Sequence, residues 1–106
     1  MTKLQIAPLA KQDLLDTSRY IAKELANPAA AQETLAKITS RIAKLTRFPK
    51  IGTPLNSVIA PQTDYRFLVC ANYLIFYRYE NKTIYVDRIL YSRRDFVKTL
   101  FGKTAE

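Results

Sequence analysis

The sequence contains no histidine and only one cysteine, Cys70. Zinc takes its ligands mainly from these two residue types, so an ordinary zinc site is excluded. A single cysteine also excludes an internal disulfide bond. Cys70 lies within the apolar run RFLVCANYLIFY, which is typical of a buried strand residue rather than a nucleophile. We therefore expect either binding alone or chemistry that needs no metal and no cofactor.

Long apolar segments are also absent. No stretch approaches the run of about 20 apolar residues that spans a bilayer, and the N-terminus lacks the basic-then-apolar layout of a secretory signal. We therefore expect a cytoplasmic protein without a membrane partner. With 2 glycines and 5 prolines in 106 residues, the composition is that of a globular chain. The length predicts a single domain over residues 1–106.

Acidic residues are few. The chain has 9 Asp and Glu against 17 Lys and Arg, which gives a formal net charge of +8 at pH 7. A domain this basic usually meets a polyanion, either a nucleic acid or an acidic protein. The alternative is a basic surface that only keeps the protein soluble.

The N-terminal half predicts one strand and two helices. The residues KLQIAPLA alternate in hydrophobicity and then reach Pro8, which cannot donate to a sheet and favours the start of a helix. From Ala10 onward, apolar residues recur at helical spacing. The stretch ANPAA breaks this pattern, and Asn27 followed by Pro28 is a typical helix start.

The second helix should carry a basic edge, because Lys37, Arg41 and Lys44 recur at positions i, i+4 and i+7. Such a row is usually a solvated helix face. A nucleic-acid contact is the alternative, and it makes Lys44 a candidate binding residue.

The C-terminal half predicts a long connection and three strands. The connection, Phe48 to Thr63, has three prolines and no clear period, and connections of this length are usually mobile or functional. The β-like runs DYRFLVC, YLIFYRYE and KTIYVDRILY follow. They are separated by Ala71-Asn72 and by Asn81, so we expect an antiparallel meander.

A short helix should close the domain. Ser92 and Asp95 match the S-x-x-D capping box, and Gly102 is a typical helix end. The predicted fold class is α+β, with the order β-α-α-β-β-β plus a short C-terminal helix. The helical hairpin should pack on an antiparallel sheet.

The segment RILYSRRDF places Arg93 and Arg94 where this helix begins, although a helix start disfavours cations. If the sheet is short and curved, these two arginines can converge with Arg66 and Arg88. Guanidinium groups and exposed N–H groups together would then attract an anion. The alternative is that Arg88 pairs with Asp87 or Asp64 and that Arg93 and Arg94 face water.

The chain resembles toxins of the RelE/ParE superfamily of bacterial type II toxin–antitoxin systems. The resemblance covers nearly the whole chain and depends on the helical hairpin followed by FPKIGTPL, on DYRFLVCANYLIFYRYE, and on IYVDRILYSRRDF. It implies a small basic protein neutralised by a co-expressed antitoxin. RelE-like members cut mRNA on the ribosome, whereas ParE-like members poison DNA gyrase.

The resemblance also implies roles for particular residues. Arg66 matches a strand arginine that contacts phosphate in RelE-like nucleases, and Arg88 matches a later cleft arginine. Tyr91 lies where RelE-like members carry a tyrosine or histidine used for proton transfer or base stacking. These three are the predicted catalytic residues. Lys50, in the long connection, corresponds loosely to the loop lysines of RelE. The predicted nucleic-acid-binding residues are Lys44, Lys50, Arg93 and Arg94.

Three functions follow from these observations. The first is a toxin that acts as a ribosome-dependent, metal-independent mRNA endoribonuclease and inhibits translation. The second is a gyrase poison that binds protein without nuclease chemistry, which the absence of histidine favours. The third is a module that retains only antitoxin binding. All three predict an acidic antitoxin partner whose binding weakens with salt.

Overall fold

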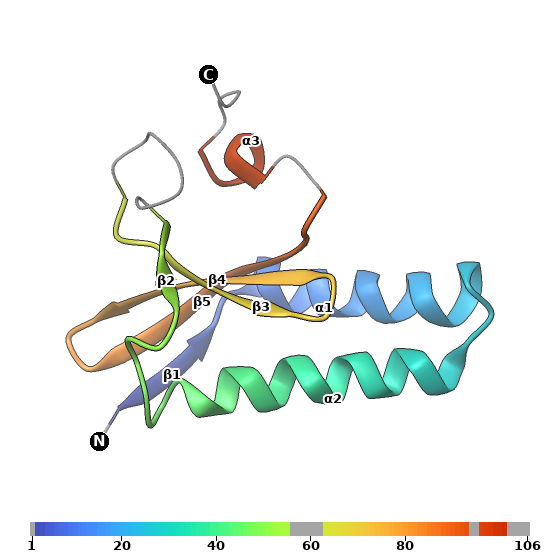
Figure 1. The fold of residues 1–106 in the computed structure, drawn as a ribbon, viewed down its shortest axis with the longest axis horizontal. Coiled ribbons are helices and arrows are strands. Elements are labelled where there is room, and N and C mark those ends of the chain that lie inside the picture. Colours follow the sequence, from blue (N-terminus) through green and yellow to red (C-terminus); the bar gives the residue numbers. More distant parts are fainter. Residues whose placement is uncertain (1, 56–62, 94–95, 102–106) are drawn as a thin grey trace.

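The computed structural model describes residues 2–55, 63–93 and 96–101, and Figure 1 shows the arrangement of its elements. The elements are β1 (Lys3–Ile6), α1 (Pro8–Arg19), the π-helical turn η1 (Tyr20–Glu24), α2 (Pro28–Lys44), β2 (Thr53–Pro54), β3 (Arg66–Cys70), β4 (Tyr73–Glu80), β5 (Thr83–Tyr91) and α3 (Phe96–Phe101). The predicted α+β class and element order are confirmed. In these residues, no helix is long and apolar enough to cross a membrane.

The strands form one sheet in the order β1-β5-β4-β3-β2. The meander β3-β4-β5 is antiparallel as predicted, but β1 pairs with β5 in parallel, so the sheet is mixed. The alternation of KLQI predicts a strand but contains no information about its direction relative to a partner about 80 positions away. The connection predicted as a loop also contains β2, which pairs with β3 through only two residues.

Two tight turns join the strands of the meander. Asn81 and Lys82 have φ values of 49° and 59° between β4 and β5, which is typical of the two-residue type I′ hairpin. The β3–β4 loop is also two residues long, and its first residue, Ala71, has a φ of 53°. Alanine rarely adopts this conformation because its Cβ approaches the following carbonyl oxygen.

The helical hairpin α1–α2 covers one face of the sheet, and α3 packs on the other face (Figure 1). The helix-side core contains alternate strand residues, among them the predicted buried cysteine, Cys70, which is 3% exposed. The core on the α3 side contains Phe76 and Leu90. Such alternation is the expected result of a sheet covered on both faces.

The predicted start of α2 is confirmed, because the side chain of Asn27 accepts a hydrogen bond from the Ala30 N–H at 3.0 Å. This bond satisfies one of the donors that a helix start leaves free. The predicted capping box at the C-terminal helix includes Asp95, which lies outside the described residues.

Candidate functional site

Arg66 lies on β3 and binds the connection that precedes β2. Its Nη1 donates to the carbonyl oxygen of Gly52 at 2.8 Å and to that of Lys50 at 3.3 Å. The structure therefore brings two predicted site residues together, Arg66 and Lys50, although the contact with Lys50 is made to its backbone. Lys50 itself is exposed. Arg66 thus fixes the backbone that carries this lysine.

Tyr77 on β4 holds the same segment from the core. Its hydroxyl donates to the Pro49 carbonyl at 2.9 Å and accepts from the Gly52 N–H at 2.9 Å. A Cβ on Gly52 would lie 2.6 Å from the ring and hydroxyl of Tyr77, so only glycine fits without displacement. Burial raises the pKa of Tyr77 above its ordinary value. Together with Arg66, this phenol fixes residues 49–52 against the sheet.

Arg88 on β5 is held by a carboxylate from the first helix. Its Nε and Nη2 donate to the two oxygens of Asp13 at 2.8 and 2.9 Å, and the Ile89 N–H also donates to Asp13 at 2.9 Å. Asp13 is only 8% exposed. The hydrogen bond to Asp13 raises the pKa of Arg88. The alternative expected from the sequence, a pair with Asp87 or Asp64, is therefore replaced by a pair with Asp13.

Asp87 belongs to a second polar cluster, which was not predicted. Its carboxylate accepts hydrogen bonds from Arg78 Nε at 2.7 Å and from the Tyr65 hydroxyl at 3.0 Å. Arg78 also stacks on the ring of Tyr85, 5.0 Å from its centroid. Burial, followed by the charge of Asp87 and the hydrogen bond to it, raises the pKa of Tyr65 to about 12. Arg78 faces Tyr85 across the β4–β5 hairpin, two positions from Asp87, and this closeness of opposite charges on paired strands is the signal that could have found the cluster.

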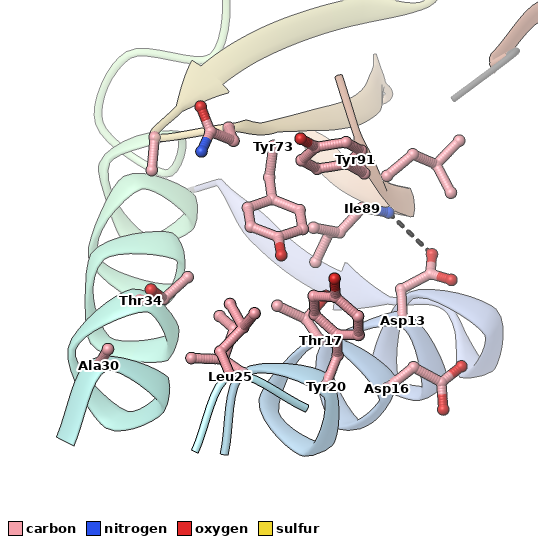
Figure 2. Close-up of a pocket in the computed structure, with 14 residues that line it drawn as sticks. Asp13, Asp16, Thr17, Tyr20, Leu25, Ala30, Thr34, Tyr73, Ile89 and Tyr91 are labelled. Atoms are coloured by element: carbon pink, nitrogen blue, oxygen red, sulfur yellow. Dashed lines mark hydrogen bonds between the residues drawn. The ribbon is translucent and has the colours of Figure 1, made fainter. Parts of the chain in front are cut away.

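Tyr91, at the end of β5, lines a cavity of about 610 Å³ between the far end of the helical hairpin and the sheet (Figure 2). Its ring meets that of Tyr73 edge-to-face, with centroids 5.8 Å apart. Figure 2 shows Tyr73 and Tyr20 directed into the space between the helices and the sheet. Two carboxylates, Asp13 and Asp16, also lie in the wall. The cavity therefore presents phenols and carboxylates rather than cations.

The remaining predicted residues take no part in the contacts described above. Lys44 is exposed at the end of α2, and Arg93 is exposed in the turn after β5. Arg94 lies outside the described residues.

The geometry therefore gives two groups in the part of the chain that the structure describes. Arg66 and Lys50 lie at the β2–β3 side of the sheet. Arg88 and Tyr91 lie on β5, beside Asp13 of α1. Arg66 and Arg88 are on strands separated by β4 and are held by different partners. The expected convergence of these two guanidinium groups on one anion pocket is not seen.

The comparisons with known proteins identify the class. Residues 4–96 match the family model described as the ParE toxin of the type II toxin–antitoxin system parDE. No curated protein matches the chain. The chain therefore belongs to the ParE toxin family of type II toxin–antitoxin systems.

A solved structure supports the fold. A chain of the chromosomal ParDE toxin–antitoxin system from P. aeruginosa matches with a TM-score of 0.67 and 19% sequence identity. The match covers 86% of this chain and 96% of that chain. The chain is thus similar in fold to that protein along almost the whole length of that protein.

Proposed function

We propose that this toxin acts by binding DNA gyrase and that it does not cleave mRNA. The observation that supports the proposal is the pairing of Arg88 with Asp13. Cleavage without a metal needs cations that are free to neutralise charge developing on the phosphate. Both oxygens of Asp13 already engage the Arg88 guanidinium, and a buried carboxylate left without its partner would be costly.

The other two predicted catalytic residues support the same conclusion. Arg66 uses its Nη1 to hold two backbone carbonyls, which gives this side chain a structural role, and Tyr91 lies on a cavity whose wall also includes Asp13 and Asp16. Asp13 is neutralised by Arg88, but the carboxylate of Asp16 would repel a phosphate backbone. The match to the ParE family agrees with a gyrase poison, since that is the activity implied by a ParE-like resemblance.

The direct test uses purified toxin with gyrase and relaxed plasmid, and in parallel with translating ribosomes. We expect supercoiling to fall and cleaved plasmid to accumulate in trapped gyrase–DNA complexes, while the mRNA remains intact. Adding the antitoxin should restore supercoiling. New mRNA ends on ribosomes, with normal gyrase activity at saturating toxin, would instead establish the nuclease.

A further inference from the structure

Three tyrosine rings from three different elements line the cavity between the helical hairpin and the sheet (Figure 2). Tyr20 belongs to η1, Tyr73 to β4 and Tyr91 to β5. The rings of Tyr73 and Tyr91 are inclined at 65° with centroids 5.8 Å apart, so their faces adjoin at a corner. Burial raises the pKa of Tyr73, and the nearby phenols of Tyr91 and Tyr20 raise it further. The three rings therefore form one tyrosine cluster.

The cavity wall carries negative charge in a protein that is otherwise basic. Among the described residues that line it there is no lysine or arginine, although the chain has 17. The carboxylate of Asp13 is neutralised by Arg88. Asp16 accepts a hydrogen bond from the neutral side chain of Gln12 at 2.9 Å, and no ion pair within the described ranges involves it. Asp16 therefore leaves one uncompensated negative charge at this cavity.

The rest of the wall is largely apolar and partly uncovered. Ile21 and Leu25 extend the surface that begins at Tyr20. Leu25 is 58% exposed and Tyr20 is 54% exposed, so both leave apolar area open to a ligand. The volume of about 610 Å³ falls in the range of about 300–1,000 Å³ that is typical of small-molecule sites.

The backbone of the helix wall is itself unusual. Tyr20 and Ile21 begin the π-helical turn η1, in which the Leu25 N–H donates to the Tyr20 carbonyl at 3.3 Å, five residues back. Such turns are rare and occur frequently at functional sites. The position of η1 at this cavity is independent of the side-chain chemistry and points to the same place.

We propose that this cavity binds a small organic cation, with its ammonium or guanidinium group against the tyrosine cluster and its apolar part against Ile21 and Leu25. Aromatic faces carry the negative part of the ring quadrupole and attract a cation within about 6 Å of the centroid. Asp16 supplies the counter-charge at the wall. The same groups disfavour an anion. The proposal goes beyond the action on gyrase and does not depend on it.

The first test compares choline with 3,3-dimethylbutan-1-ol, which has the same shape but a neutral carbon in place of the nitrogen. Each is titrated into the free toxin and followed by the NMR signals of the tyrosine rings. We expect choline to bind at least about fivefold more tightly, because only the cation gains from the ring faces and from Asp16. Equal affinities, tighter binding of the alcohol, or no saturable choline binding would overturn the proposal.

A second test changes the rings. Tyr20→Leu removes an aromatic face at an exposed position, and thermal unfolding of the free variant checks that it still folds. We expect choline affinity to fall at least about fivefold, whereas Tyr20→Phe, which keeps the face, should stay within about twofold of the wild type. An equal loss for choline and for the neutral alcohol would show that Tyr20 contributes packing alone, against the proposal.

A third test changes the charge. Asp16→Asn should weaken choline binding and reduce its dependence on salt, and it should leave binding of the neutral alcohol unchanged. The matched change Glu33→Gln removes an exposed carboxylate of α2 that does not line the cavity, and it should keep choline affinity within about twofold. Equal effects of the two variants would contradict the role of Asp16.

A free molecule and the side chain of a bound protein can both carry such a cation. N-acetyl-arginine amide, which presents its guanidinium as a protein does, is therefore titrated in parallel. Tighter binding of choline assigns the cavity to free organic cations, as proposed. Binding of the arginine derivative alone would overturn that assignment and identify a side chain of a partner as the ligand.

Discussion

Arg88 and Asp13, 75 positions apart in the sequence, form a two-pronged ion pair that joins the end of the sheet to the first helix. Only 18% of the Arg88 side chain and 9% of the Asp13 side chain are exposed. The Ile89 N–H donates to the same carboxylate, so the pair also fixes the backbone of β5. Its loss should therefore affect stability before it affects any chemistry.

Asp13→Asn tests the contribution of this pair. The variant leaves a guanidinium largely buried without a counter-charge, and we expect a loss of about 3 kcal/mol in the free energy of unfolding. The matched control is Glu33→Gln, which breaks a pair whose side chains are 68% and 59% exposed and should cost less than about 0.5 kcal/mol. Denaturant unfolding measures both. Equal small losses would mean that the Arg88–Asp13 pair has no structural role.

Gly52→Ala tests the attachment of residues 49–52. The added methyl would lie 2.6 Å from Tyr77 and 2.9 Å from the Phe67 carbonyl oxygen, so we expect a loss of about 2 kcal/mol. Tyr77→Phe keeps the ring but removes the hydrogen bonds to Pro49 and Gly52, and it should cost about 1–2 kcal/mol. Denaturant titration gives the values, and an unchanged midpoint for Gly52→Ala would show that the segment is not held as described.

Ala71→Gly should stabilise the protein. Ala71 has a φ of 53°, where a Cβ costs about 1 kcal/mol, and glycine avoids that cost. The matched change Ala36→Gly, at an exposed position inside α2, should instead destabilise by about 1 kcal/mol. Thermal unfolding should thus shift in opposite directions for the two variants. A lower melting temperature for Ala71→Gly would contradict the backbone conformation of this turn.

Stability should fall at alkaline pH. Burial and Asp87 raise the pKa of Tyr65 to about 12 from an ordinary value of 10.0. Between these two values the unfolded chain loses the phenolic proton while the folded chain keeps it, so the free energy of unfolding decreases as pH rises. The stabilisation is complete below about pH 10.

Tyr65→Phe should flatten this decline, because its ring has no titrating proton. Part of the decline should remain, since burial also raises the pKa of Tyr73 and of Tyr77. Urea unfolding at several pH values from 9 to 12 measures both slopes. Identical slopes for the wild type and the variant would show that Tyr65 does not titrate differently in the folded and unfolded chains.

Local sequence patterns predicted most of the fold. The sequence predicted the start of α2 at Asn27-Pro28 and the burial of Cys70 in β3. Both could be predicted because helix caps and strand alternation depend on residues close in sequence. The parallel pairing of β1 with β5 and the two-residue strand β2 depend on contacts between distant segments. Hydrophobic pattern does not report such contacts.

The site was harder to predict for the same reason. The number and position of the arginines are visible in the sequence, but their partners are not. Asp13 lies in the first helix, so no spacing rule connects it to Arg88. Asp87, one of the two carboxylates that the alternative interpretation paired with Arg88, binds Arg78 across the β4–β5 hairpin instead.

The order in which replication and translation stop in the cell tests most directly whether the toxin acts on gyrase. After brief induction of the toxin, incorporation of labelled thymidine and of labelled methionine should be measured in the same culture. Poisoned gyrase stops replication first, so we predict that thymidine incorporation falls while methionine incorporation continues. An immediate fall in methionine incorporation, with replication continuing, would contradict the account and identify mRNA as the target.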